Sequence, residues 1–150
     1  MAPTDDEAAR RRLQRLHLAV GWAALLGFAL FGLVLEALHA WKTPSYLGVA
    51  AEPRRLLWTL AHAHGLGLGL VNLALAATVR ALPRAPHSAA SPCLLAATLL
   101  VPGGFFAGGL FVHGGDPGLG ALLVPPGALL LLVALGLVLR ACFGGDRPER

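Results

Sequence analysis

Histidines and carboxylates are the side chains of this sequence best suited to chemistry. The chain has six histidines and eight acidic residues. Glu36 and His39 stand in the spacing Glu-x-x-His, which places both side chains on one face of a helix. Inward-facing metal ligands of helical bundles use the same spacing. Because imidazole and carboxylate suit copper, zinc, iron or manganese, the pair predicts transition-metal binding.

Two other segments supply groups for the same site. His62 and His64 belong to the string Ala-His-Ala-His-Gly, and His113 precedes Asp116 in a tight Gly-Gly-Asp-Pro-Gly turn. On a regular helix His62 shares a face with Gly65, whereas His64 lies about 160° away from His62. One ion cannot easily use both, so His62 ranks first as a ligand.

The predicted metal site combines side chains from three parts of the chain. The predicted ligands are Glu36, His39, His62 and His113, and the supporting or alternative ligands are His64, Asp116 and Asn72. All of these except Asn72 are expected in a shallow layer just inside one membrane boundary. A carboxylate there costs free energy unless it is paired, protonated or coordinated.

Other interpretations of these residues stay open. Histidines from two helices can bind haem iron, which would make the chain a haem-binding or respiratory accessory subunit. Intramembrane polar groups can also carry protons or a substrate. In a third interpretation the histidines bond only to water, headgroups or loop carbonyls, and the chain is a cofactor-free structural bundle. Asn72 alone is more often a hydrogen-bonding contact between helices.

No catalytic residue can be identified from the sequence. Neither Ser nor Cys stands beside these histidines in a nucleophile motif. The glycines after His64 fall within a predicted membrane span rather than in a phosphate-binding loop. Cys93 and Cys142 are expected at the cytoplasmic face, where a disulfide is disfavoured.

The segments that carry these residues are apolar enough to cross a membrane. The chain is 56% hydrophobic and 13% charged, whereas soluble domains are about a quarter charged. About 20 residues of helix match a hydrocarbon core of about 30 Å. Four spans are predicted: Leu18–Ala40, Leu56–Val79, Cys93–His113 and Leu119–Ala141.

Short connections between these spans favour antiparallel neighbours. The predicted fold is therefore an all-α membrane protein, an up-down-up-down bundle of four transmembrane helices. It has an N-terminal cytoplasmic tail (1–17), a membrane domain (18–141) and a C-terminal cytoplasmic tail (142–150).

Arginines determine the predicted orientation. Nine basic residues fall on the side of the two termini and the middle loop and three on the other side; the nine are Arg10, Arg11, Arg12, Arg15, Arg80, Arg84, Arg140, Arg147 and Arg150, and the three are Lys42, Arg54 and Arg55. This bias predicts cytoplasmic termini. Trp22 then marks the inner interface, and Trp41, Tyr46 and Trp58 mark the outer one. His17 and His87 are expected on the cytoplasmic side, away from the metal site.

The predicted environment is a bacterial inner membrane, and lipid is the main partner. Only one lysine accompanies eleven arginines, a composition typical of GC-rich bacteria. The net charge of +4 comes from arginines at the ends of apolar runs, so it does not indicate nucleic acid. A homo-oligomer or a larger membrane complex stays open.

Small residues and prolines predict how the helices pack. Gly65 and Gly69 on the second span, and Gly104 and Gly108 on the third, have the spacing that allows close helix approach in lipid. We therefore expect these two spans to pack through their glycines. Pro102 is expected to kink the third span, and Pro125-Pro126 either to kink the fourth or to mark the start of its regular part.

Overall fold

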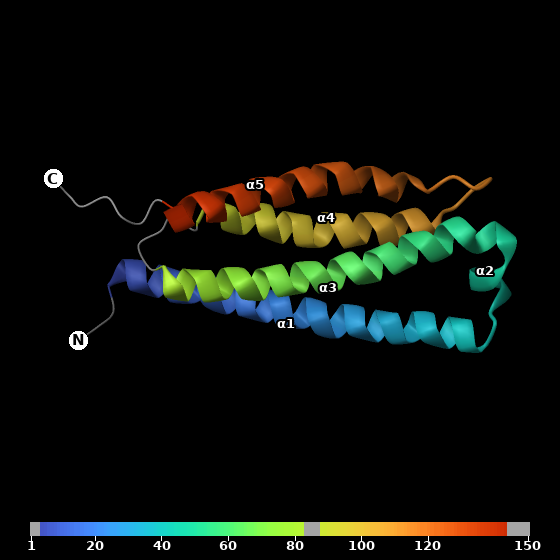
Figure 1. Cartoon of the computed structure of the whole chain (residues 1–150), viewed down its shortest axis with the longest axis horizontal. Helices are drawn as coiled ribbons and strands as arrows, with labels where there is room; N and C mark the ends of the chain where they lie inside the picture. The colour runs from blue at the N-terminus through green and yellow to red at the C-terminus, as the bar shows by residue number, and fades with distance from the viewer. Residues whose placement is uncertain (1–3, 83–87, 144–150) are drawn as a thin grey trace.

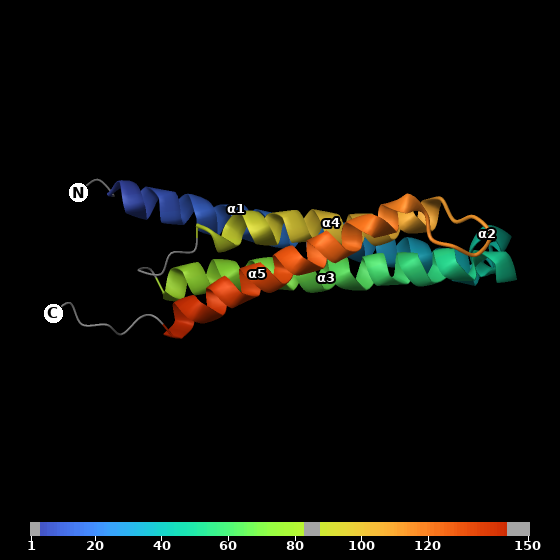
Figure 2. The same cartoon turned by 90° about the horizontal axis from the view of Figure 1, so that it is seen from above.

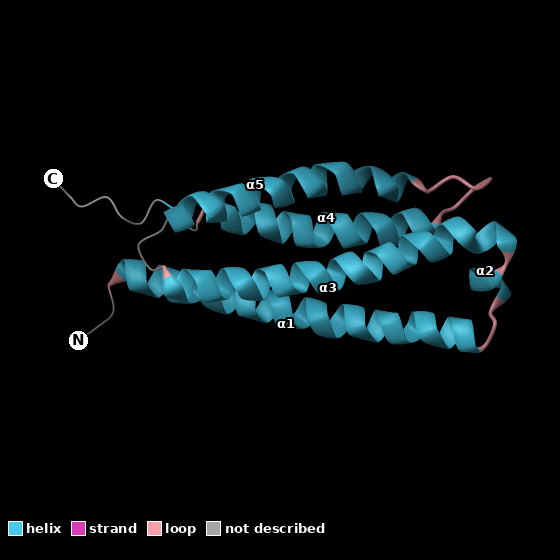
Figure 3. Cartoon of the chain, in the orientation of Figure 1, coloured by secondary structure: helices cyan, strands magenta, loops and turns pink. Residues whose placement is uncertain are grey.

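Four long helices dominate the computed structural model, which describes residues 4–82 and 88–143 (Figure 1). The long helices are α1 (Asp5–Ala40), α3 (Glu52–Ala81), α4 (Ala90–Leu110) and α5 (Val124–Phe143). Shorter pieces are α2 (Pro44–Leu47), η1 (Val49–Ala51) and η2 (Leu119–Leu123). Within the described ranges there is no strand, and loops are short (Figure 3). Four helical segments in this part of the chain are long and apolar enough to cross a membrane.

The first helix begins earlier than the apolar run. The Glu7 amide donates to the Thr4 hydroxyl at 3.4 Å, so Thr4 caps the helix. Acidic residues fill the first turn, where the helix dipole favours negative charge. The segment predicted as an N-terminal tail is therefore helical from Asp5 onward, and α1 has 36 residues.

Each of the other predicted spans contains a long helix. Pro125-Pro126 lie in the first turn of α5, which confirms that they mark the start of its regular part. Pro102 lies inside α4. That helix ends at Leu110, so His113 lies in the following turn rather than at the end of a helix, as the sequence predicted.

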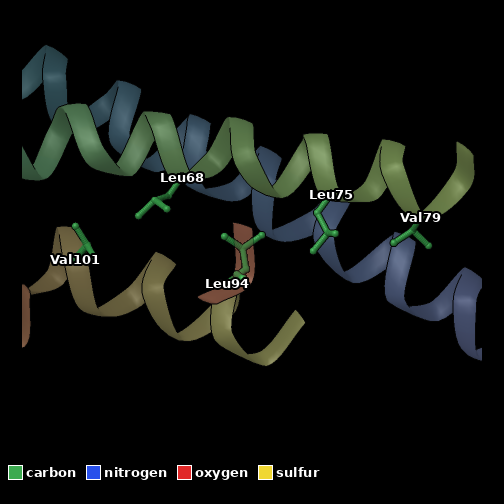
Figure 4. Packing of buried hydrophobic residues seen from close by; sticks show 6 residues of the cluster. Leu68, Leu75, Val79, Leu94 and Val101 are labelled. Atoms are coloured by element: carbon green, nitrogen blue, oxygen red, sulfur yellow. The ribbon is translucent and has the colours of Figure 1, made fainter. Parts of the chain in front are cut away.

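The helices are arranged in sequence order. α1 packs against α3, α3 against α4, and α4 against α5 (Figures 1 and 2). A buried apolar cluster fills the space between α3, α4 and α5; it consists of Leu68, Leu75, Val79, Leu94, Val101 and Ala134 (Figure 4). Most large apolar side chains of α1 and α5 are exposed, which suits contact with lipid.

The glycines of α3 pack against α1 rather than against α4. A Cβ on Gly65 would overlap the ring of Phe28, and a Cβ on Gly69 would lie 3.1 Å from the Gly21 carbonyl oxygen. Phe28 and Gly21 both belong to α1. These glycines do allow close approach, but the neighbour predicted from the sequence was wrong.

The glycines of α4 likewise serve another contact. A Cβ on Gly104 would lie 3.1 Å from the Gly120 carbonyl oxygen, and one on Gly108 would lie 3.1 Å from the Ala121 Cβ. Both neighbours belong to η2. The contact between α3 and α4 is made mainly by the apolar cluster, because larger side chains occupy that interface.

Candidate functional site

Glu36 and His39 lie in the last turns of α1, and both are exposed. The His39 ring meets Tyr46 edge to face, with ring centroids 5.1 Å apart. Glu36 makes no hydrogen bond or ion pair with any other described residue. The two side chains are therefore open to a ligand.

His62 is held at the contact between α1 and α3. Its Nδ1 lies 2.7 Å from the Phe28 carbonyl oxygen. Because a carbonyl only accepts, Nδ1 carries the proton and donates it, and Nε2 of the neutral ring keeps its lone pair. A Cβ on Gly32 would overlap the His62 ring, so this glycine makes room for the imidazole. The result is a half-buried histidine fixed against the α1 backbone.

His64 lies on another side of α3 and is exposed. Its Nδ1 donates to the Leu60 carbonyl oxygen, one turn earlier, at 2.8 Å. The imidazole lies beside Phe105 of α4, with ring centroids 5.0 Å apart. The Nε2 atom of the neutral ring again keeps its lone pair, and here no helix backbone covers the imidazole.

His113 and Asp116 form the turn after α4. Their backbones pair as an isolated bridge, and both residues are exposed. The His113 Nδ1 donates to the Phe111 carbonyl oxygen at 3.1 Å. The tight turn predicted around Asp116 is therefore present, and it lies on the surface.

The structure does not gather the predicted ligands into one group. Within residues 4–82 and 88–143, no three His, Cys, Asp or Glu side chains lie where they could jointly hold a metal ion. His62, His64 and His113 share a different property. Each donates Nδ1–H to a main-chain carbonyl and keeps Nε2 as an acceptor.

A buried polar cluster near the other end of the bundle was not predicted. His17 of α1 is fully buried, with its Nδ1 at 2.7 Å from the Asn72 Oδ1 and its Nε2 at 2.8 Å from the Ser91 Oγ. The Asn72 amide nitrogen donates to the Thr98 hydroxyl and to the Leu68 carbonyl oxygen, both at 2.8 Å. This His17 cluster, formed by His17, Asn72, Ser91 and Thr98, joins α1, α3 and α4.

The bonding within the His17 cluster determines its protonation pattern. Since the Asn72 nitrogen already has two acceptors, its oxygen faces His17 and accepts from Nδ1–H. In the neutral ring Nε2 then accepts from the Ser91 hydroxyl. Both imidazole nitrogens are satisfied, so His17 is a structural residue rather than a free ligand.

Two residues of this cluster had been given other expectations as well. His17 was predicted in a cytoplasmic tail, yet it lies inside the bundle. Asn72 was given two interpretations, a contact between helices or support for the metal site; its bond to His17 confirms that it is a contact between helices. His87 falls outside the described residues.

Aromatic residues close the end of the bundle near the predicted outer face. Trp58 stacks between Tyr46 and Phe106, with centroid distances of 6.2 Å and 5.8 Å. Its Nε1 donates to the Phe106 carbonyl oxygen at 3.2 Å. Arg54 donates to the Gly109 carbonyl oxygen at 3.0 Å and so ties α3 to α4. Tyr46, predicted as an interface marker, is only 1% exposed and belongs to this internal stack.

Comparison with protein-family models, with curated proteins and with solved structures found no match for this chain. The function must therefore be argued from the geometry of the histidines.

Proposed function

We propose that this chain is a multi-pass protein of a bacterial inner membrane, an up-down-up-down bundle with both termini in the cytoplasm. The four apolar helices support this proposal, as does the placement of the start of α1 and the end of α5 at one end of the molecule (Figure 1). Nine of twelve basic residues are assigned to that end. A reporter enzyme active only in the cytoplasm, fused after Arg150, should be active; a reporter active only in the periplasm should be silent there, and the reverse result would overturn the orientation.

We further propose that the protein binds a transition metal in the form of haem, with His64 Nε2 as a ligand of the iron. The observation that carries this proposal is an exposed imidazole on a helix that is long and apolar enough to cross a membrane. His64 follows Trp58, the predicted marker of the outer interface, by six residues, or about 9 Å along the axis of α3. An unpartnered imidazole nitrogen in hydrocarbon costs free energy, which a ligand would offset.

Haem fits this arrangement better than a bare ion. Zinc sites usually need three or four protein ligands, and no three candidate side chains come together in the described residues. The porphyrin itself supplies the equatorial ligands of haem iron, so one or two histidines suffice. Between the two predictions, we therefore prefer haem to a bare transition-metal ion, with His64, an alternative ligand of the predicted ion site, as the protein ligand of the iron.

The surroundings of His64 suit a histidine that would hold haem iron. Metal-binding histidines commonly donate their other ring N–H to a carbonyl, which fixes the tautomer and the ring orientation. His64 already makes that bond with Leu60. The neighbouring Phe105 ring offers an apolar, planar surface against which a macrocycle could pack. His62 makes the same kind of bond, but its ring is enclosed against Gly32.

Absorption spectroscopy of the detergent-purified protein tests the proposal. Titration with haemin should give a shifted Soret band that saturates. His64→Ala should abolish the shift, and His62→Ala, a matched change two residues away, should preserve it. Haemin binding that is equal in all three proteins would overturn the role of His64.

Elemental analysis of the same preparations tests the four-ligand alternative. We expect no stoichiometric copper, zinc or manganese in any variant. Should the parent hold such an ion, and should His62→Ala and Glu36→Ala lose it while His64→Ala keeps it, the bare-ion site would replace the haem proposal.

A further inference from the structure

Helices α1 and α4 meet at two levels and leave a groove between them. Toward the predicted outer face the rings of Phe31 and Phe106 touch, with centroids 5.4 Å apart. Toward the predicted inner face, His17 bonds to Ser91 at 2.8 Å. Between these contacts lies a groove of about 310 Å³ in which no lining residue has a polar side chain.

The groove exists because small residues line both of its walls. Ala23, Ala24 and Gly27 form the α1 wall, and Gly103 lies in the α4 wall. A Cβ added at Gly27 or at Gly103 would meet no atom within 4 Å. Both glycines are exposed, so the groove opens sideways from the bundle. Protein interiors rarely leave apolar gaps of this size unfilled, and within a membrane the filling material is hydrocarbon.

The depth of the groove corresponds to one leaflet. Its α1 wall runs from Ala23 to Phe31, about 12 Å along the helix axis. Trp22, which is 63% exposed, comes immediately before it and suits the inner interface. With the proposed orientation, on which this step rests, the groove lies among the acyl chains of the cytoplasmic leaflet.

Unpaired positive charge lies on α1 beyond the inner end of the groove, on the predicted cytoplasmic side. Arg12 and Arg15 are exposed and make no hydrogen bond or ion pair with other described residues, whereas Arg11 pairs with Glu7. Arg15 precedes Ala23 by about 12 Å and Arg12 by about 17 Å along α1, so their long side chains must extend toward the membrane to reach a phosphate. Guanidinium groups bind phosphate oxygens well, and basic residues beside a membrane span attract anionic lipids.

We propose that the α1–α4 groove binds one acyl chain of an anionic phospholipid of the cytoplasmic leaflet, with its phosphate held by Arg12 and Arg15. The apolar walls recognise the chain, and the two arginines recognise the headgroup. His64 does not line the groove, so this site is independent of the haem proposal.

Native mass spectrometry with phosphatidylglycerol tests the groove. The double variant Gly27→Leu/Gly103→Leu should fill it and lower the bound fraction about tenfold, since two side chains displace several methylenes. The matched control is Gly67→Leu/Gly136→Leu, because a Cβ at those glycines also meets nothing within 4 Å and neither glycine lines the groove. Equal lipid binding by the two double variants would overturn the groove as the site.

Two further measurements, one on an arginine variant and one on the parent protein, complete the test. Arg12→Gln/Arg15→Gln should remove the preference for phosphatidylglycerol over phosphatidylcholine; an unchanged preference would overturn the headgroup contact.

Should the groove variant fail to fold, photocrosslinking of the parent with a phosphatidylglycerol that has a diazirine on its acyl chain decides the question. Labels should appear on the segments 23–31 or 102–106, which line the groove, and labels confined to other segments would contradict the proposal. The reporter fusion separately detects a failure of the orientation.

Discussion

The two ends of the bundle use histidine in opposite ways. Toward the end that holds the start of α1, called the inner end after its predicted orientation, His17 is buried and both of its ring nitrogens bond to side chains of other helices. In the outer half, His62 and His64 each use one nitrogen for a main-chain carbonyl and leave the other without a partner. The inner histidine therefore holds helices together, and the outer histidines keep an atom available for a ligand.

This difference shows that the position of a histidine along a helix does not by itself tell whether its side chain stabilises the bundle or can bind a ligand. The deciding property is whether the second ring nitrogen has a partner. A histidine with both nitrogens bonded to buried side chains has no free lone pair for a metal, and in the described part of the chain His17 is the buried example. His64, which has one nitrogen free, satisfies the first requirement for binding a metal.

Loss of the inner histidine should have the largest effect on stability. His17→Leu removes two hydrogen bonds and leaves Asn72 and Ser91 without one partner each. Buried polar groups without partners are costly, so we expect a loss of about 3 kcal/mol in the free energy of unfolding. Circular dichroism during titration of the detergent-solubilised protein with SDS measures it.

The matched change on the exposed turn is His113→Leu. Its imidazole bonds only to a neighbouring carbonyl and is exposed, so we expect a change of less than about 0.5 kcal/mol. Similar losses for His17→Leu and His113→Leu would remove the distinction between the two ends.

The sequence predicted the local features of the fold well because they depend on neighbouring residues. The lengths of the apolar segments located the four long helices. Helix α1 begins earlier than its apolar segment, at Asp5, because its first turn is capped and acidic. Helix periodicity also placed His62 and His64 on different faces of α3, as the structure has them. The turn between His113 and Asp116 follows from its glycines, two of which have positive φ.

The sequence could not predict which faces meet, because that depends on residues far apart in the chain. Gly65 was expected against the third span, but Phe28 fills the space beside it. The same difficulty affects the candidate site, since one shared depth does not bring Glu36 and His113 together. One signal was available for the inner cluster: His17, Gly21 and Phe28 follow a helical repeat and so share one face of α1.

Close packing, rather than hydrogen bonding by histidine, should stabilise the outer half of the contact between α1 and α3. A Cβ on Gly65 would overlap the Phe28 ring, whereas a Cβ on Gly67 of the same helix would meet no atom within 4 Å. Gly65→Leu must therefore push the helices apart, and we expect it to cost about 2 kcal/mol. Gly67→Leu should change the free energy of unfolding by less than about 0.5 kcal/mol, because its side chain would enter open space beside the helix.

His62→Ala separates the packing contribution from the hydrogen-bond contribution at this contact. The ring donates one hydrogen bond to the Phe28 carbonyl oxygen, and a single hydrogen bond between membrane helices contributes about 0.6 kcal/mol on average. We therefore expect the loss from His62→Ala to be smaller than that from Gly65→Leu in the same SDS titration. The reverse order would mean that the histidine bond, as at the inner end, dominates this contact, and the contrast between the two ends would fail.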